Sequence, residues 1–153
     1  MAEFEELYDK IKELPTYEIE IGVVSEKTKR KVRIGVTNAE LMFIHENGSP
    51  IRHIPARPVL QMTIDWANKN IVKKTIDKCI NLYLDSNFDK SVGEIELKKL
   101  CLRMENYARD IIYSNDGRLV PNSPSVAAKK KGNHPLFDSG QLARSITCQL
   151  IEV

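Results

Sequence analysis

Hydrophobic residues recur at helical spacing near the start of the chain, between acidic side chains. The stripe consists of Phe4, Leu7, Tyr8, Ile11 and Leu14. Pro15 ends the pattern, because its ring fixes φ and removes the backbone donor that a continuing helix needs. Spacings of three and four residues place the stripe on one face. Residues 3–14 are therefore predicted to form a short amphipathic helix that docks on another part of the protein.

The pattern then changes to alternation of apolar and polar residues, which is typical of a β-strand with one buried face. Residues 17–24 alternate in this way, and a second alternating run covers residues 31–36 after a polar stretch. The two runs are predicted to pair as an antiparallel hairpin. Residues 146–152 alternate as well and are predicted to add a third strand to the same sheet.

Two Thr/Ser-x-x-Glu sequences mark predicted helix starts, because these side chains satisfy free backbone donors reciprocally. The first is Thr-Asn-Ala-Glu at 37–40, and the short helix after it is predicted to end at Asn47-Gly48. The second is Ser-Val-Gly-Glu at 91–94, which opens a long helix predicted to end at Asn115. Apolar residues of this second helix share one predicted buried face: Ile95, Leu97, Leu100, Cys101, Met104, Ala108, Ile111 and Ile112.

A longer helical stripe begins after Pro58, which suits the first position of a helix. The stripe consists of Leu60, Ile64, Ala67, Ile71, Ile76, Ile80 and Tyr83. It predicts a helix of about 40 Å that ends near Asp85. Trp66 lies within this helix and is predicted to be a core residue, with an exposed interface anchor as the alternative.

These elements predict an α+β fold, in which a small antiparallel sheet is packed by two long helices plus a short N-terminal helix. The length of 153 residues fits one domain covering 1–153. Residues 118–135 lose periodicity and collect prolines and serines, which predicts a mobile loop. Asp138 is predicted to cap the single helical turn that follows.

Composition and charge exclude several classes of protein. With 42% hydrophobic and 29% charged residues, the chain is typical of a soluble globular protein, and neither a signal peptide nor a membrane helix is expected. The net charge of +2 is too small to indicate nucleic-acid binding by itself. The run Lys129-Lys130-Lys131 is either a solvated loop tip or a patch that contacts phosphate or an acidic protein surface.

The chain shows little sign of catalytic chemistry. Cys79, Cys101 and Cys148 are an odd number at wide spacing, so they are predicted to be reduced core residues of a cytosolic protein. His45-Glu46 begins like a zinc-protease helix, but position 49 is Ser49 rather than the histidine that this motif needs. His53 and His134 are predicted to be ordinary loop residues. We therefore expect no enzyme activity, metal or cofactor.

Two stretches carry a resemblance to a known family. The first runs from His45-Glu46-Asn47-Gly48 through Ile54-Pro55-Ala56-Arg57-Pro58 into the long helix. The second runs from Pro121-Asn122-Ser123-Pro124 through the lysine run to Pro135-Leu136-Phe137-Asp138-Ser139-Gly140-Gln141-Leu142 and Ser145-Ile146. In this order they resemble the tail-completion, or neck, proteins of long-tailed bacteriophages, a group that includes Mu-like virion morphogenesis proteins and lambda-like minor tail components. Conservative departures occur at Val59, Phe137 and Ser139.

The resemblance implies a non-enzymatic structural protein of the virion neck, which assembles in the host cytoplasm as a ring of copies between the head connector and the tail. Implied partners are further copies of the chain, a connector or head-closure protein, and a tail-tube or tail-terminator protein, with non-specific proximity to channel DNA and no membrane. A head-closure or tail-terminator ring protein is the neighbouring alternative. A nucleic-acid-binding regulator is an alternative from another class.

Two surfaces are predicted by position to make these contacts. The proline-rich loop is expected to touch a neighbouring subunit, because stiff chain loses little entropy when it is immobilised. Its predicted interface residues are Asn47, Gly48, Ile54, Pro55, Ala56, Arg57 and Pro58. Lys129, Lys130 and Lys131 are expected to order on assembly and to face the DNA channel or an acidic neighbour.

Overall fold

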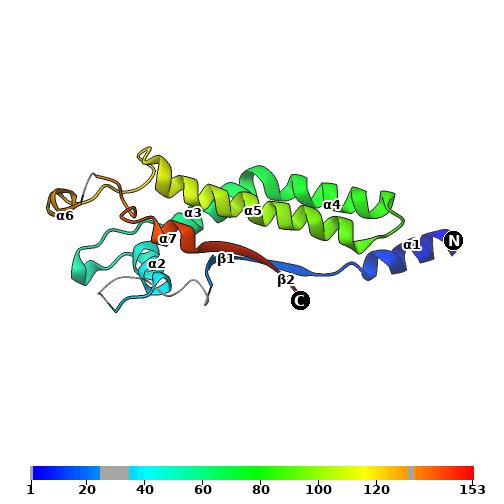
Figure 1. Ribbon diagram of the computed structural model, residues 1–153. Helices are drawn as coiled ribbons and strands as arrows, with labels where there is room; N and C mark the ends of the chain where they lie inside the picture. The colour runs from blue at the N-terminus through cyan, green and yellow to red at the C-terminus, as the bar shows by residue number, and fades with distance from the viewer. Residues whose placement is uncertain (1, 25–34, 131–132) are drawn as a thin grey trace.

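The computed structural model is elongated, with two long helical segments lying along a two-stranded sheet (Figure 1). It describes residues 2–24, 35–130 and 133–153. In chain order the elements are α1 (Ala2–Lys12), β1 (Tyr17–Val23), α2 (Asn38–Asn47), the 3-10 turn η2 (Pro50–Arg52), α3 (Val59–Ala67), the π-helical turn η3 (Asn68–Val72), α4 (Lys73–Asp85), α5 (Lys90–Ser114), α6 (Pro124–Lys129), α7 (Gln141–Ser145) and β2 (Ile146–Glu152). The predicted α+β class is confirmed.

The sheet joins the two ends of the chain. Strands β1 and β2 pair antiparallel, from Tyr17 opposite Glu152 to Val23 opposite Ile146. The prediction that residues 146–152 return to the first strand is therefore confirmed. For the predicted strand at 31–36, residues 31–34 lie outside the described residues, and Gly35 and Val36 form no strand.

The long helix predicted from Pro58 is present but contains a π-helical turn. Helices α3 and α4 are continuous through η3, which inserts an extra residue into the helical repeat. The sequence carries a signal for this insertion, because the apolar stripe steps by five residues from Ile71 to Ile76. Trp66 is half-buried and stacks on Tyr107 of α5, with ring centroids 4.0 Å apart.

Part of the predicted stripe is not buried. Ile76 and Ile80 of α4 are 46% and 44% exposed, and Ile95 of α5 is also exposed. Thr63 and Thr75 are buried instead, where their hydroxyls donate to backbone carbonyls one turn earlier at 2.8 and 2.9 Å. The helices pack through a face narrower than the apolar stripe, so isoleucines at its edge stay in solvent.

The two predicted capping boxes have different outcomes. The box at 37–40 is confirmed: Thr37 Oγ1 accepts from the Glu40 amide, and the Glu40 carboxylate accepts from the Thr37 amide. The box at 91–94 is wrong, because α5 begins one residue before Ser91 and Asp89 is its N-cap. Asp89 Oδ1 accepts from the Ser91 amide at 2.9 Å, which is the donor that the Glu94 carboxylate was predicted to satisfy.

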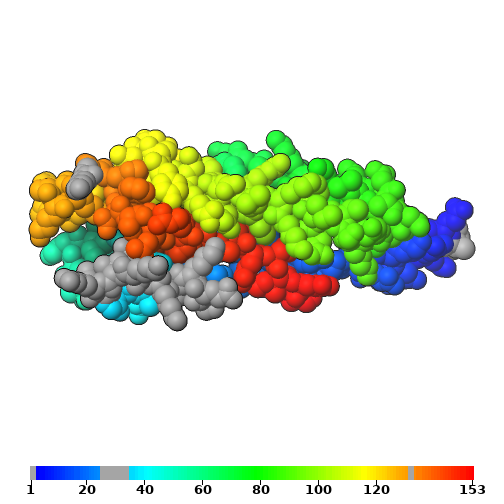
Figure 2. Space-filling model, in the orientation of Figure 1, coloured from blue at the N-terminus to red at the C-terminus, as the bar shows by residue number. Residues whose placement is uncertain are grey.

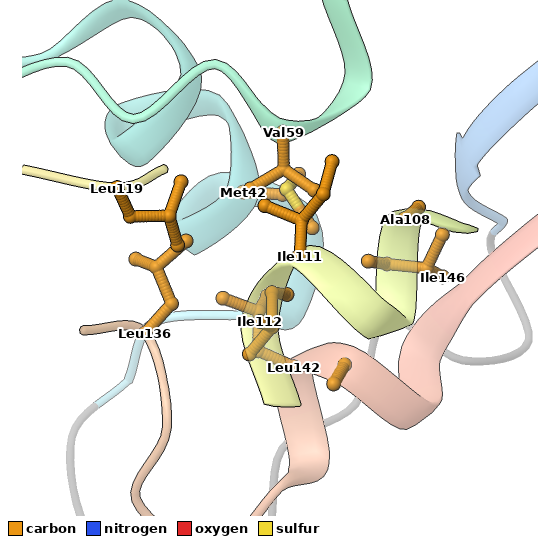
Figure 3. Close-up of a cluster of buried hydrophobic side chains, with 10 residues drawn as sticks. Met42, Val59, Ala108, Ile111, Ile112, Leu119, Leu136, Leu142 and Ile146 are labelled. Atoms are coloured by element: carbon orange, nitrogen blue, oxygen red, sulfur yellow. The ribbon is translucent and has the colours of Figure 1, made fainter. Parts of the chain in front are cut away.

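The main core lies at the end of the molecule that holds α2 and α7. Figure 3 shows side chains from α2, α3, α5 and α7 converging with residues of the segments between elements. Its buried members are Met42, Val59, Ala108, Ile111, Ile112, Leu119, Leu136, Leu142, Ala143 and Ile146. A second cluster of Ala67, Leu100 and Met104 continues the core toward the middle of α5. Together these clusters hold the sheet against the long helices.

The three cysteines are free thiols, but the prediction that they are core residues holds only for Cys101. Cys101 is buried, whereas Cys79 and Cys148 are half-buried. Cys101 of α5 and Cys148 of β2 lie beside one another, and the interaction with the Cys101 thiol, together with burial, raises the pKa of Cys148. Burial likewise raises the pKa of Cys79. The reactive thiolate of Cys79 therefore forms under alkaline conditions.

Glu96 connects the two long helices. Its carboxylate oxygens lie 2.8 Å from Lys78 Nζ of α4 and 2.6 Å from Lys99 Nζ of α5. The hydrogen bonds from Lys78 and Lys99 lower the pKa of Glu96 from 4.5 to about 2.

This depressed pKa gives a pH dependence with a defined sign. The stabilisation by the Glu96 carboxylate is present above the unfolded pKa of 4.5 and is lost as the pH falls toward about 2. The stability difference between the native chain and Glu96→Gln should therefore shrink over this range, which urea unfolding at a series of pH values measures. A difference that stays constant down to the lower pH would contradict the assignment.

Helix α1 forms as predicted but does not dock through its apolar face. It extends past the end of the α4–α5 hairpin (Figure 1), and Phe4, Leu7, Tyr8 and Ile11 are exposed. Its last turn is attached to the body, where Tyr83 Oη donates to the Lys10 carbonyl at 3.0 Å. The apolar stripe that predicted a docking helix is thus presented to solvent.

Candidate functional site

The first of the two resembling stretches folds as a tight turn after α2. The Ser49 and Ile54 backbones exchange two hydrogen bonds of 2.8 and 2.9 Å around η2. Gly48 has φ 74° and ψ 179°, a conformation that is essentially restricted to glycine. Its α-carbon lies so close to the returning chain that an added Cβ would be 2.8 Å from the Ala56 nitrogen. The turn is therefore specified by its backbone contacts.

Arg57 joins this turn to the second stretch. Arg57 is buried, with an exposed fraction of 5%. Its guanidinium donates to the carbonyls of Val120 at 2.7 Å and Pro121 at 3.0 Å. A longer contact of 3.4 Å reaches Asn122 Oδ1. Burial lowers the pKa of Arg57, but a guanidinium stays charged in proteins. The side chain thus stabilises the fold, and the place of Arg57 in a subunit interface stays a prediction.

Glu46 connects the turn to the helix that follows it. Its two carboxylate oxygens accept from the amides of Leu60 at 3.1 Å and Gln61 at 2.7 Å, in the first turn of α3. These amides have no intrahelical partner, and a negative charge there is favoured by the helix dipole. Glu46 lies far before α3 in sequence, so capping rules that search adjacent positions do not find it.

Replacing Glu46 with Ala should lower the free energy of unfolding by about 1–2 kcal/mol, as expected for loss of a helix cap. Urea denaturation followed by circular dichroism measures this change. Gln61→Ala is a matched control, because it keeps the backbone amide that Glu46 binds and removes an exposed side chain whose bond to Asp65 contributes only about 0.2–0.5 kcal/mol. An equal loss in both variants would contradict the capping role.

The two stretches form the walls of one groove of about 640 Å³. The turn contributes Arg52, His53, Ile54 and Pro55, and α2 contributes Leu41 and His45. The opposite wall comes from residues between 122 and 142, including Lys130 and Asp138. We call it the turn–loop groove. The groove is lined by the basic side chains of Arg52, Arg57 and Lys130 and by the imidazoles of His45 and His53, whereas Asp138 is the one carboxylate among its described lining residues. It therefore favours an acidic or polar partner.

The predicted loop at 118–135 has fixed ends and contains a short helix. Leu119, Pro135 and Leu136 are buried, and α6 occupies its middle. Lys129 is exposed, whereas Lys130 is half-buried and its Nζ donates to the Phe137 carbonyl at 3.3 Å. Lys131 lies outside the described residues. Lys129 and Lys130 therefore lie in different environments, and both the contacts of the lysine run and the mobility of the loop stay predictions.

Asp138 does not cap the helical turn that was assigned to it. Helix α7 begins after Gly140, which is its N-cap with φ 74°, and no side chain of the described residues supplies a cap bond there. The turn is instead braced by Arg144, whose guanidinium donates to the Ser139 carbonyl at 3.0 Å. The N-cap of α7 is therefore the left-handed Gly140, two residues after the predicted N-cap Asp138. Asp138 is exposed and lines the groove.

The outer surface of the turn differs from the predicted interface in one important residue. Asn47, Pro55 and Ala56 are exposed, and Gly48, Ile54 and Pro58 are half-buried. Ile51, which was not predicted, is 93% exposed at the tip. An isoleucine between Pro50 and Arg52, at the tip of the proline-rich loop, was the available signal. Phe43 of α2 is also 70% exposed, so this end of the molecule carries two large apolar side chains.

The histidines do not converge. His45 and His53 both line the turn–loop groove, whereas His134 contacts the Ile112 carbonyl through Nε2. Within residues 2–24, 35–130 and 133–153, no three His, Cys, Asp or Glu side chains are grouped so that they could hold a metal ion.

Comparison with known proteins yields no relative: no family model, no curated protein and no solved structure matches this chain. None of the helices in the described part of the chain combines the length and the apolar character needed to cross a membrane.

Proposed function

We propose that this protein is a non-enzymatic structural component of the neck of a long-tailed bacteriophage, where a ring of copies joins the head connector to the tail. The resemblance of its two stretches to tail-completion proteins is the basis of this proposal. Its partners would be further copies of the chain, the connector or head-closure protein, and a tail-tube or tail-terminator protein.

The observation that carries the proposal is the joining of the two stretches. The hydrogen bonds of Arg57 connect the turn to Val120 and Pro121, more than sixty positions later in the chain. The two connected stretches enclose the turn–loop groove. The turn has a rigid backbone and an exposed apolar tip at Ile51, which are features of a surface that binds with little loss of entropy. The shared motif is thus compatible with a preformed docking surface.

Electron microscopy of a lysate from a phage with a stop codon in this gene tests the proposal. Full heads beside separate complete tails are expected. Empty or leaking heads would indicate head closure, and overlong tails would indicate termination. Normal infectious particles would remove a role in the virion.

A complementing copy with Ile51→Asp examines the turn itself. It should fold normally, because Ile51 is exposed, and should fail to restore joined particles. Leu102→Asp is the matched control, because it makes the same kind of change at an exposed leucine of α5 away from the turn, and it should restore joined particles. If purified protein instead binds duplex DNA with an affinity that falls steeply in salt, the regulator alternative gains support.

A further inference from the structure

Two apolar surfaces of this chain were predicted to be buried and are exposed. One is the stripe of α1, formed by Phe4, Leu7, Tyr8 and Ile11. The other is the edge of α4, where Ile76 and Ile80 face solvent. Exposed contiguous apolar surface on a soluble protein commonly marks an interaction site. The structure therefore presents two unpartnered surfaces that require an occupant.

The α4 edge belongs to a largely apolar groove of about 380 Å³, which we call the hairpin groove. It lies between α4 and α5 and is closed on one side by the start of β1. Its lining residues are Leu14, Pro15, Tyr17, Ile19, Val72, Ile76, Cys79, Ile80, Tyr83, Lys90, Gly93, Glu94, Leu97 and Leu100. Two of them, Lys90 and Glu94, are charged.

The α1 stripe has the spacing of a groove-binding helix. Its four residues stand at positions i, i+3, i+4 and i+7, which is the anchor pattern of amphipathic helices that bind in apolar grooves. At 1.5 Å per residue the stripe is about 10 Å long, and the α4 wall from Val72 to Tyr83 is about 16 Å long. The groove is therefore long enough to hold all four apolar side chains of one α1 helix.

Charge favours the same pairing. Residues 2–13 contain five acidic and two basic side chains, and Glu3 and Glu5 flank the apolar stripe in its first turn. In the groove, Glu94 is neutralised by Lys98 at 2.5 Å, while Lys90 has no acidic partner among the described residues. Lys73 is exposed one turn before Ile76 on the same helix edge. An acidic helix thus meets a groove with a basic rim.

The helix of the same copy is held away from its own groove. Tyr83 lines the groove, and its hydroxyl bonds the Lys10 carbonyl at the groove's end. Lys10 Nζ also lies over the Phe88 ring at 4.3 Å. From this attachment α1 points beyond the hairpin (Figures 1 and 2), so its apolar stripe is available to another molecule.

We propose that α1 of one copy docks in the hairpin groove of a second copy, as an exchanged arm. Because helix and groove are different surfaces, the contact closes a two-fold dimer when it is reciprocal and generates a ring or a filament when it continues from copy to copy. The inference goes beyond the proposed neck function, because it concerns the isolated protein and holds whatever the protein joins.

Disulfide trapping between two full-length variants tests the contact, because Cys79 already lines the groove. One copy carries Leu7→Cys, Tyr8→Cys or Ile11→Cys together with Cys79→Ser, and the other is the native chain with a tag that changes its mass. Oxidation at alkaline pH, which ionises the Cys79 thiol, should yield a mixed dimer for at least one stripe position. The dimer should disappear when the tagged copy carries Cys79→Ser.

Asp9→Cys in the same background is the matched control, because Asp9 lies on the opposite face of α1. Equal trapping through Asp9→Cys, or no trapping through any stripe position, would overturn the proposal. In sedimentation experiments Leu7→Glu and Ile80→Glu should each weaken self-association at least about tenfold, with unchanged circular dichroism. Unchanged self-association in both variants would also overturn it.

These outcomes are independent of the phage experiment. Trapping in the purified protein, together with normal particles from the stop-codon phage, would leave the arm contact standing and remove the neck function. Absent trapping with unjoined heads and tails would do the reverse.

Discussion

Replacing Gly48 with Ala should lower the free energy of unfolding by about 3 kcal/mol or more. A φ of 74° with extended ψ costs a residue with a Cβ about 1–3 kcal/mol in backbone strain. The added Cβ would also stand 2.8 Å from the Ala56 nitrogen and 2.9 Å from the Ile54 carbonyl oxygen. Both are backbone atoms of the returning turn, so relief requires the turn to open. Urea denaturation measures the loss.

Gly117→Ala separates the two causes. Gly117 also has a positive φ, of 90°, but an added Cβ there meets no atom within 4 Å. It should cost about 1–2 kcal/mol from conformation alone. If Gly48→Ala were no more destabilising than Gly117→Ala, the close approach of the turn to its own start would contribute nothing to stability.

Arg57→Ala should lower the free energy of unfolding by about 3 kcal/mol. Hydrogen bonds from a charged donor contribute about 1.5–3 kcal/mol each, and the variant leaves the Val120 and Pro121 carbonyls without this donor. The second effect is local, because amide exchange of residues near 119–123 should accelerate once the segment is released from the turn. Thermal or urea unfolding and hydrogen-exchange mass spectrometry measure the two effects.

Two variants sharpen the Arg57 result. Arg57→Lys keeps the charge but not the planar fork that reaches two carbonyls, so it should recover less than half of the loss. Arg52→Ala removes an exposed arginine of the same turn and should change stability by less than about 0.5 kcal/mol. Similar losses from Arg52→Ala and Arg57→Ala would show that the buried contacts do not link the two stretches.

The predictions for Gly48 and Arg57 bear on function through the groove. Both residues shape the turn–loop groove without offering a side chain to a partner. Their loss should therefore damage joining only as far as it unfolds the turn, whereas Ile51→Asp should damage joining in a stable protein. This difference separates residues that build the surface from residues that contact the partner.

Local patterns in the sequence were sufficient for most of the elements. Periods of two and of three to four residues located β1, β2 and the longer helices, because each has one apolar face on a regular backbone, whereas α6 lies in a stretch that was predicted to be a loop. The box at 37–40 was found for the same reason, since its hydrogen bonds join residues three positions apart. The π-helical turn was not predicted, although the apolar stripe steps by five residues from Ile71 to Ile76 beside it.

The contacts that build the candidate site depend on residues distant in sequence. Glu46 caps α3 from the end of α2, and Arg57 bonds carbonyls beyond residue 119, so neither role has a local signature. Asp138 shows the opposite error: the local sequence predicts that Asp138 is the N-cap of α7, but the N-cap is the left-handed Gly140. Lys130 was predicted to face solvent, the DNA channel or an acidic neighbour, and its contact with the Phe137 carbonyl has no local signature in the sequence.

What the sequence by itself determined is the α+β class, the position of the elements and which helix faces are apolar, because these follow from backbone periodicity and side-chain polarity. Only the tertiary structure decided which apolar faces are covered. The main core buries Ile111 and Ile112, yet Leu7 and Ile80 stay exposed on equally regular stripes. Periodicity reports that a face is able to bury apolar area, whereas burial itself requires a second surface to lie against it.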